Sequence, residues 1–203
     1  EQARQTAQQI TQLSRRSIAV RADLAVHEQI AAMLDKIRSE LGPIDALINN
    51  AAVFVRTPPE EFDTALWKQI FEINVFAPAA LSQLLAKQMK IRGAGKIINV
   101  LDTATQRPFA SHAGYCASKA ALASLTKSWA KAFAPQVQVN AVAPGIIDWP
   151  DFFSEAQQQS YLHRTPLART ATYEDVAATV LFLLKEASFL TGQIINVDGG
   201  RTL

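Results

Sequence analysis

The sequence predicts an α/β domain in which a parallel sheet is covered by helices on both faces. Short apolar runs alternate with helical segments of ten or more residues along the 203-residue chain. Consecutive apolar positions within the runs are typical of strands buried on both sides. Strands that alternate with helices form parallel sheets, so we expect one doubly wound domain over residues 1–203.

The first elements follow from periodicity and from turn residues. Polar residues around sparse apolar ones predict an outward-facing helix over Glu1–Leu13. A short strand is expected over Ser17–Asp23, and an amphipathic helix over Val26–Leu41 ends at Gly42-Pro43. The apolar residues Ile44–Ile48 then predict a strand that runs into two asparagines.

The remaining elements continue the same alternation. The predicted order is one or two helices within Phe62–Met89, a strand Ile97–Leu101 opened by Gly95-Lys96, a helix Ala113–Phe133, a strand Val137–Val142, an irregular region 144–169, a helix Glu174–Leu184 and a strand Gln193–Val197. No repeat or linker indicates a second domain.

Composition narrows the classes of function. Twenty basic and eighteen acidic residues give a net charge of +2, and no basic run indicates a nucleic-acid or membrane-surface partner. The single cysteine, Cys116, excludes an internal disulfide and is typical of a reducing cytosol. No stretch resembles a membrane span or a signal peptide, so we expect a cytoplasmic protein. His27 and His163 lack ligand-spaced partners, so no metal is predicted.

The chemistry is indicated first by Tyr115 and Lys119. Four residues apart on a predicted helix, they place a phenol and an ammonium on one face. A nearby cation stabilises phenolate and is expected to lower the pKa of Tyr115 towards neutrality, where it could act as a general acid.

An ordered set of motifs surrounds this pair. It comprises Asn49-Asn50-Ala51-Ala52, Asn74, Gly95–Val100, Asn140–Gly145, Thr191-Gly192-Gln193 and Val197–Gly200. The set resembles the short-chain dehydrogenase/reductase family over nearly the whole chain. The resemblance implies a Rossmann-like NAD(P)H-dependent oxidoreductase that forms a homotetramer. It also implies that Lys119 binds the nicotinamide ribose and that Asn74 holds a water linking Lys119 to solvent.

The start of the family pattern is missing from these residues. Such folds begin with a strand, a Gly-rich turn and a helix that receives the pyrophosphate, yet no glycine precedes Asp23. We therefore expect that a βαβ-sized segment of at least ~30 residues is absent. The segment around Ile18 would then lack ladder partners. NADPH is expected from the resemblance alone, because the residues that select it belong to the missing segment.

Further cofactor contacts are implied by the same resemblance. Asp23 and Leu24 match the adenine contact, although Asp23 could instead be a helix N-cap. The other implied contacts, made largely through the backbone, are Asn50, Ala51, Ala52, Pro144, Gly145 and Ile147.

Asp102 departs from the usual pattern, in which a serine lies thirteen positions before the tyrosine. An ionised carboxylate cannot donate to a developing alkoxide, whereas a carboxyl group can pass a proton through Tyr115 to a ring nitrogen. This arrangement resembles the bacterial pteridine reductases, with Phe54 stacking on the pterin and Trp149 in the substrate loop. The predicted substrate is a pterin or dihydrofolate.

Several alternatives remain open. Asp102 could be a turn former, with Thr103 or Thr105 supplying the hydroxyl; Phe54 could be a core residue, and Trp149 could only anchor its loop. The protein would then be a carbonyl or hydroxyl dehydrogenase of the same family. A non-catalytic fragment or an oligomerisation module is the alternative from another class.

Overall fold

A four-stranded parallel sheet forms the centre of the molecule. The computed structural model describes residues 1–203 and places the strands in the order β1-β2-β3-β4. Their bounds are β1 Ala46–Asn49, β2 Gly95–Val100, β3 Val137–Pro144 and β4 Ile194–Val197. All neighbouring strands are parallel, so the residues after β1, β2 and β3 meet at one edge, as expected for a site of this fold.

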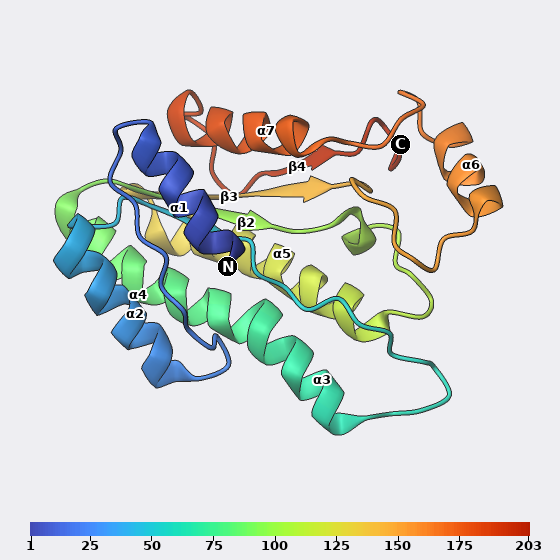
Figure 1. Ribbon diagram of the computed structural model, residues 1–203, viewed down its shortest axis with the longest axis horizontal. Helices are drawn as coiled ribbons and strands as arrows, with labels where there is room; N and C mark the ends of the chain where they lie inside the picture. The colour runs from blue at the N-terminus through green and yellow to red at the C-terminus, as the bar shows by residue number, and fades with distance from the viewer.

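Helices cover both faces of the sheet, as the sequence predicts (Figure 1). On one face α4 (Ala77–Arg92) and α5 (Ala113–Phe133) pack against the strands, and α2 (His27–Leu41) packs against α4. A buried cluster of sixteen apolar residues, including Leu85, Ile97 and Val139, fills this layer. The other face is covered by α7 (Tyr173–Lys185), whose Leu183 packs with Ile98 and Val142 of the sheet.

The remaining helices are peripheral or short. They are α1 Gln2–Gln12, α3 Thr64–Phe71, the π-helical turn η1 Glu72–Phe76, the 3-10 turn η2 Thr103–Thr105 and α6 Glu155–His163. No residue of α1 is buried, which agrees with its polar sequence. The π-helical turn η1 joins α3 directly to α4 and contains the buried Asn74.

A buried chain of polar side chains ties the sheet to the helices beneath it. Asn49 of β1 donates to Ser82 of α4 at 3.2 Å and to Asn99 of β2 at 2.8 Å. Asn99 in turn donates to Thr126 of α5 at 2.8 Å. Because unpaired amides are costly inside a core, these bonds fix the register of β1 and β2 relative to α4 and α5.

Two predicted elements are wrong. The segment Ser17–Asp23 forms no strand, because β1 is the edge of the sheet and pairs only with β2, so this segment has no ladder partner. The region 144–169 is not wholly irregular, since it contains α6. This helix begins with a capping box in which Ser154 and Gln157 exchange side-chain hydrogen bonds with each other's backbone.

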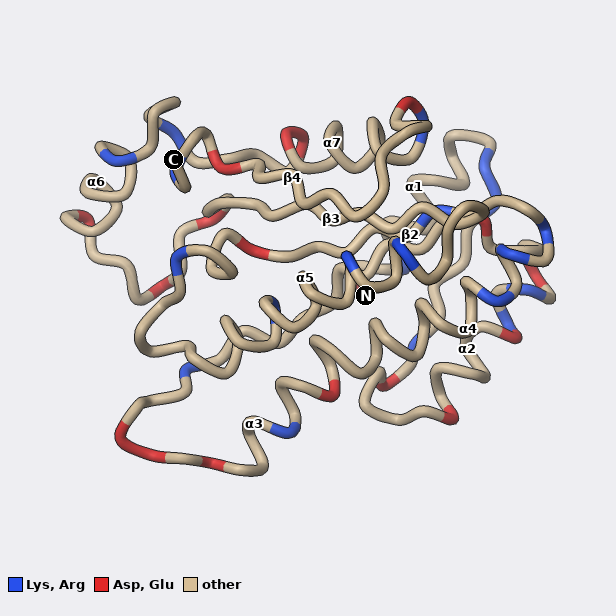
Figure 2. Tube along the Cα trace, turned by 180° about the vertical axis from the view of Figure 1, so that it is seen from behind, with Lys and Arg blue, Asp and Glu red and all other residues tan.

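Charges of both signs are distributed along the trace (Figure 2). None of the helices combines the length and the apolar character that a bilayer crossing requires.

Candidate active site

Tyr115 and Asp102 are brought together where β2 meets the start of α5. Asp102 lies two residues after the end of β2, and its Oδ1 accepts from the Ala104 amide at 2.7 Å, which fixes the carboxylate. Its Oδ2 accepts the hydrogen bond of the Tyr115 hydroxyl at 2.8 Å. The first turn of α5 is held by a bond from the Gly114 amide to the Thr57 hydroxyl at 3.0 Å. The pair predicted from the sequence therefore forms a direct hydrogen bond.

The electrostatics of Tyr115 differ from the expectation. Burial, then the charge of Asp102 and the hydrogen bond to it, raise the pKa of Tyr115 far above its ordinary value. The expected shift of the Tyr115 pKa towards neutrality is therefore not found in the protein alone. The negative charge of Asp102 is hydrogen-bonded to the phenol, whereas the Lys119 ammonium lies 5.8 Å from the centre of the tyrosine ring.

Lys119 is itself strongly perturbed. Its ammonium donates to the Val100 carbonyl at 2.8 Å, and only 3% of the residue is exposed. Burial lowers the pKa of Lys119 to about 8, although the charge of Asp102 acts in the opposite direction. Lys119 is thus a buried amine that can exchange a proton near neutral pH.

Asn74 is fully engaged with protein groups. Its Oδ1 accepts from the Val53 amide at 2.8 Å, and its Nδ2 donates to the Val53 carbonyl at 3.0 Å and to the Ser118 hydroxyl at 3.0 Å. Both amide hydrogens are used, so the side chain fastens the loop after β1 to α5. The water link expected for Asn74 stays a prediction.

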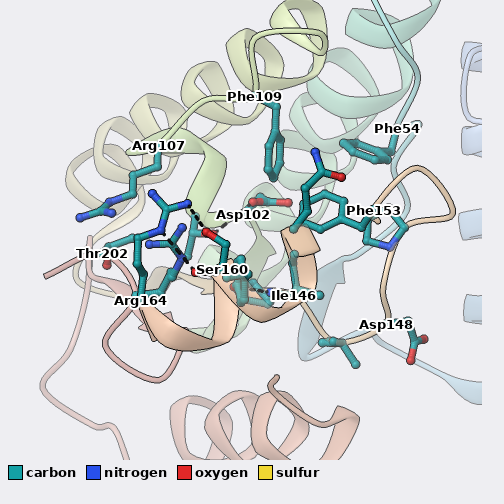
Figure 3. Close-up of a pocket in the computed structure, with 18 of the residues that line it drawn as sticks. Phe54, Asp102, Arg107, Phe109, Ile146, Asp148, Phe153, Ser160, Arg164 and Thr202 are labelled. Carbon is teal, nitrogen blue, oxygen red and sulfur yellow. Dashed lines mark hydrogen bonds between the residues drawn. The ribbon is translucent and has the colours of Figure 1, made fainter. Parts of the chain in front are cut away.

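A cavity of about 700 Å³ opens beside the Tyr115–Asp102 pair (Figure 3). Its walls include six residues that the sequence predicts for the site: Phe54, Asp102, Tyr115, Pro144, Gly145 and Ile147. Trp149 is not among the lining residues. Instead its ring packs on Phe153 and edge-on against Tyr161, so it supports the wall, the anchoring role that the sequence left open.

Phe54 is partly exposed at the cavity and is supported by aromatic neighbours. Its ring meets Tyr115 edge-on at 4.7 Å between centroids, and His112 stacks parallel to it at 4.3 Å. His112 is 2% exposed, because Phe54 and Phe152 both cover it. Only the face of Phe54 away from His112 is available to a ligand.

The other predicted cofactor contacts lie elsewhere. Leu24, Asn50 and Ala51 line a second, mainly apolar cavity of about 400 Å³ beside β1. Asp23 is exposed and its carboxylate accepts from the Ala25 amide at 2.9 Å, which stabilises the turn before α2. It is not the N-cap of α2, which is Val26. Ala52 is exposed and lines neither cavity.

Tyr115 and Lys119 are the residues that could hold the nicotinamide-ribose half of a dinucleotide. In this structure the Tyr115 hydroxyl donates to Asp102 and the Lys119 ammonium donates to Val100, and Lys119 lines neither cavity. Residues 1–203 contain no Gly-rich turn of the kind that binds a pyrophosphate.

Comparison with known proteins agrees with this architecture. Residues 1–202 match the family model described as "Enoyl-(Acyl carrier protein) reductase". The chain belongs to the short-chain dehydrogenase/reductase family.

Named members of the family act on several kinds of substrate. Cis-4-hydroxycyclohexanecarboxylate dehydrogenase of Sinomonas cyclohexanicum is 34% identical over 92% of this chain and 77% of its own length. L-xylulose reductase of Bos taurus is 40% identical over 79% of this chain and 68% of its own. A gluconate 5-dehydrogenase from Burkholderia cenocepacia, solved with NADP and tartrate, has a TM-score of 0.91 and 28% identity, covering 98% of this chain and 80% of that one.

Several residues that line the main cavity were not predicted from the sequence. Arg107, Tyr161, Arg164 and Arg201 all face the cavity, and each comes from a loop, from α6 or from the C-terminal turn. The sequence Ser154-Glu155-Ala156-Gln157 carries the capping-box pattern that would have located α6. Nothing in the periodicity indicates that the three arginines converge.

Proposed function

We propose that this protein is an NAD(P)-dependent dehydrogenase that interconverts a secondary alcohol and a carbonyl compound. The observation that carries the proposal is the Tyr115–Asp102 hydrogen bond in the wall of a cavity large enough for a small metabolite. The named relatives support this reading, which the sequence offered as the alternative to pteridine reduction.

The hydrogen bond suggests a path for the proton of the alcohol. The nicotinamide, when bound, supplies the hydride acceptor. As the carbon–oxygen double bond forms, the hydroxyl proton of the substrate passes to the Tyr115 oxygen while the Tyr115 proton passes to Asp102 Oδ2. Tyr115 stays neutral throughout, which agrees with its raised pKa. In the reverse direction a protonated Asp102 returns the proton through Tyr115 to the carbonyl oxygen.

Lys119 and Asn74 have supporting parts in this proposal. The Lys119 ammonium, fixed by Val100, would bind the nicotinamide ribose. Asn74 would hold the loop that carries Phe54 in place through its two bonds to Val53. We propose NADP(H) as the cofactor because two of the similar solved structures hold NADP. Asp23, Leu24, Asn50, Ala51, Ala52, Pro144, Gly145 and Ile147 stay proposed cofactor contacts.

Pteridine or dihydrofolate reduction is the second candidate function. It is favoured by the carboxyl-to-phenol hydrogen bond and by the partly exposed Phe54 ring beside Tyr115, on which a flat heterocycle could stack. The three named relatives do not share it, since their names refer to hydroxy acids and a sugar. We therefore rank it below alcohol oxidation.

One assay separates the two candidates. The purified protein is tested for NADP⁺- and NAD⁺-dependent oxidation of hydroxy acids, polyols and steroids, and for NADPH-dependent reduction of dihydropterin and dihydrofolate. We expect alcohol oxidation, and Tyr115→Phe should lower it about 10²- to 10⁴-fold while dinucleotide binding persists. Turnover of pterins alone, or full activity of Tyr115→Phe, would overturn the proposal.

The assembly is also a proposal. Phe76, the N-cap of α4, is 54% exposed and Leu84, in the middle of α4, is 41% exposed, which favours burial of this helix in the expected homotetramer. Light scattering of the purified protein would give the mass; a monomer at micromolar concentration would exclude the tetramer.

A further inference from the structure

Three arginines converge on one side of the main cavity. Arg107 follows η2, Arg164 ends α6, and Arg201 lies in the C-terminal turn. Figure 3 shows Arg107 and Arg164 beside Thr202 and Ser160, opposite Phe54. Figure 2 likewise shows basic positions at the end of α6 and beside the C-terminus. One side of the cavity is therefore strongly positive.

No side-chain carboxylate forms an ion pair with these arginines, although the charge of Asp198 acts to raise the pKa of Arg201. Arg107 donates to the Leu203 main-chain oxygen at 2.9 Å, and Arg164 donates to the Ser160 main-chain and hydroxyl oxygens at 3.4 and 3.3 Å. None of the three arginines takes part in an ion pair.

The two carboxylates that line the cavity are already engaged. Asp102 accepts from Tyr115 and from the Ala104 amide, and Asp148 accepts from the hydroxyl of Tyr173. Nearby Asp198 accepts from the Gly200 amide and from the amide and hydroxyl of Thr202.

Arg201 is the group without a partner. Its Nε and Nη1 atoms are buried and make no hydrogen bond. Buried guanidinium hydrogens that lack an acceptor are costly, so a small movement of the side chain that lets an anion in the cavity accept from them would be favourable. Burial first, and then the charge of Arg164, lower the pKa of Arg201, which is the effect that a bound anion would reverse.

The Arg201 side chain is also held in place. Its guanidinium lies over the Tyr161 ring at 4.8 Å from the centroid. The Tyr161 hydroxyl accepts from the Ile146 amide at 3.0 Å, and Trp149 meets the same ring edge-on. Arg201 is thus preorganised, which lowers the entropic cost of binding a ligand.

We propose that the substrate of this dehydrogenase carries a carboxylate and that Arg201 binds it, with Arg107 and Arg164 adding to the positive potential. That the anion is a substrate rests on the proposed function. The anion site itself rests on the arginines alone. Phe54, Phe109 and Phe153 form apolar walls of the same cavity. They suit the carbon skeleton of a hydroxy acid or keto acid, whose carboxylate matches the planar guanidinium.

Binding of cyclohexanecarboxylate and of cyclohexanecarboxamide, measured by titration calorimetry, tests the anion site without turnover. We expect the acid to bind at least roughly 10-fold more tightly than the amide, and Arg201→Met to abolish this preference. Arg201→Lys keeps the charge and should retain part of it. Arg15→Met removes an exposed arginine outside both cavities and serves as the matched control.

The outcomes distinguish the two proposals. Equal affinity for acid and amide, or a preference that survives in folded Arg201→Met, overturns the carboxylate site. Weaker binding of NADP⁺ to Arg201→Met with an unchanged carboxylate preference would also overturn it, because the anion would then belong to the dinucleotide. Tighter binding of the acid without oxidation of any alcohol would contradict the proposed dehydrogenase function but support the anion site. Oxidation of neutral and acidic alcohols with equal kcat/KM would support the dehydrogenase function and refute the proposal that the substrate carries a carboxylate.

Discussion

The Tyr115 hydroxyl donates to Asp102 Oδ2 at 2.8 Å, so the phenol and the carboxylate act as one hydrogen-bonded unit. Usual members of the family carry a serine at the position of Asp102, and a serine hydroxyl can donate to a carbonyl oxygen. Here the carboxylate accepts instead, and this reverses the direction of the hydrogen bond at the reacting oxygen.

Replacement of Asp102 by Asn should lower the pKa of Tyr115. The charge of Asp102 raises this pKa, and Asn removes that charge while burial and the neighbouring Cys116 still raise the pKa. Tyrosinate absorbance during a pH titration measures the change, and the signal that disappears on adding Tyr115→Phe belongs to Tyr115. A Tyr115 titration at the same pH in both backgrounds would contradict the coupling.

Asp102→Ser tests the carboxylate as the acceptor of the Tyr115 proton. A serine hydroxyl cannot take up this proton, so alcohol oxidation should fall by ~10² or more while dinucleotide binding persists. Steady-state kcat/KM for alcohol oxidation gives the answer. Oxidation retained within about tenfold would show that the proton does not pass to Asp102.

Lys119→Met should change how stability depends on pH. In the folded protein the pKa of Lys119 is about 8, whereas the ordinary value is 10.5. Between these values the folded state has released the proton that the unfolded chain still binds, so stability rises with pH in this window. From pH ~7.5 to ~9.5 the wild type should gain roughly 2 kcal/mol relative to the variant in urea unfolding. If the difference in the free energy of unfolding between wild type and variant stays constant over this pH range, the pKa of Lys119 is not lowered in the folded protein.

Asn74→Ala should destabilise the fold by about 2 to 3 kcal/mol, because it leaves the buried polar groups of Val53 without partners. Activity should fall as well, since Phe54 follows Val53 directly. Asn50→Ala, at an exposed asparagine without side-chain hydrogen bonds, is the stability control and should change the free energy of unfolding by less than about 0.5 kcal/mol. Equal effects of the two variants in urea unfolding would exclude this role of Asn74.

Gly145→Ala should raise KM more than it lowers kcat. A Cβ at this position would lie 2.9 Å from the Tyr161 hydroxyl and 3.2 Å from the Asp198 Cα, so the Tyr161 ring beneath Arg201 must shift. The Tyr115–Asp102 bond does not involve this wall. Gly93→Ala is the control: its φ of +84° is strained for alanine, but it lies at the end of α4 outside both cavities. An unchanged KM in Gly145→Ala would show that Tyr161 does not shape the substrate site.

Local patterns predicted most of the helices and strands. The helix Ala113–Phe133 was predicted with its observed bounds because it is long and uninterrupted, and its four-residue spacing places Tyr115 and Lys119 on one face. Asp102 was predicted beside Tyr115 from the resemblance, because the family carries a serine thirteen positions before the tyrosine. The segment Ser17–Asp23 could not be judged locally, because a strand exists only where a neighbouring strand pairs with it.

The sequence by itself determined the parallel α/β fold, the family and the identity of Tyr115, Lys119 and Asp102, because each rests on periodicity or on ordered local motifs. Only the tertiary structure decided the sign of the Tyr115 pKa shift, the burial of His112 and the convergence of Arg107, Arg164 and Arg201. These features depend on distances between side chains of separate segments. Burial and Coulomb energies vary with such distances, and no local pattern encodes them.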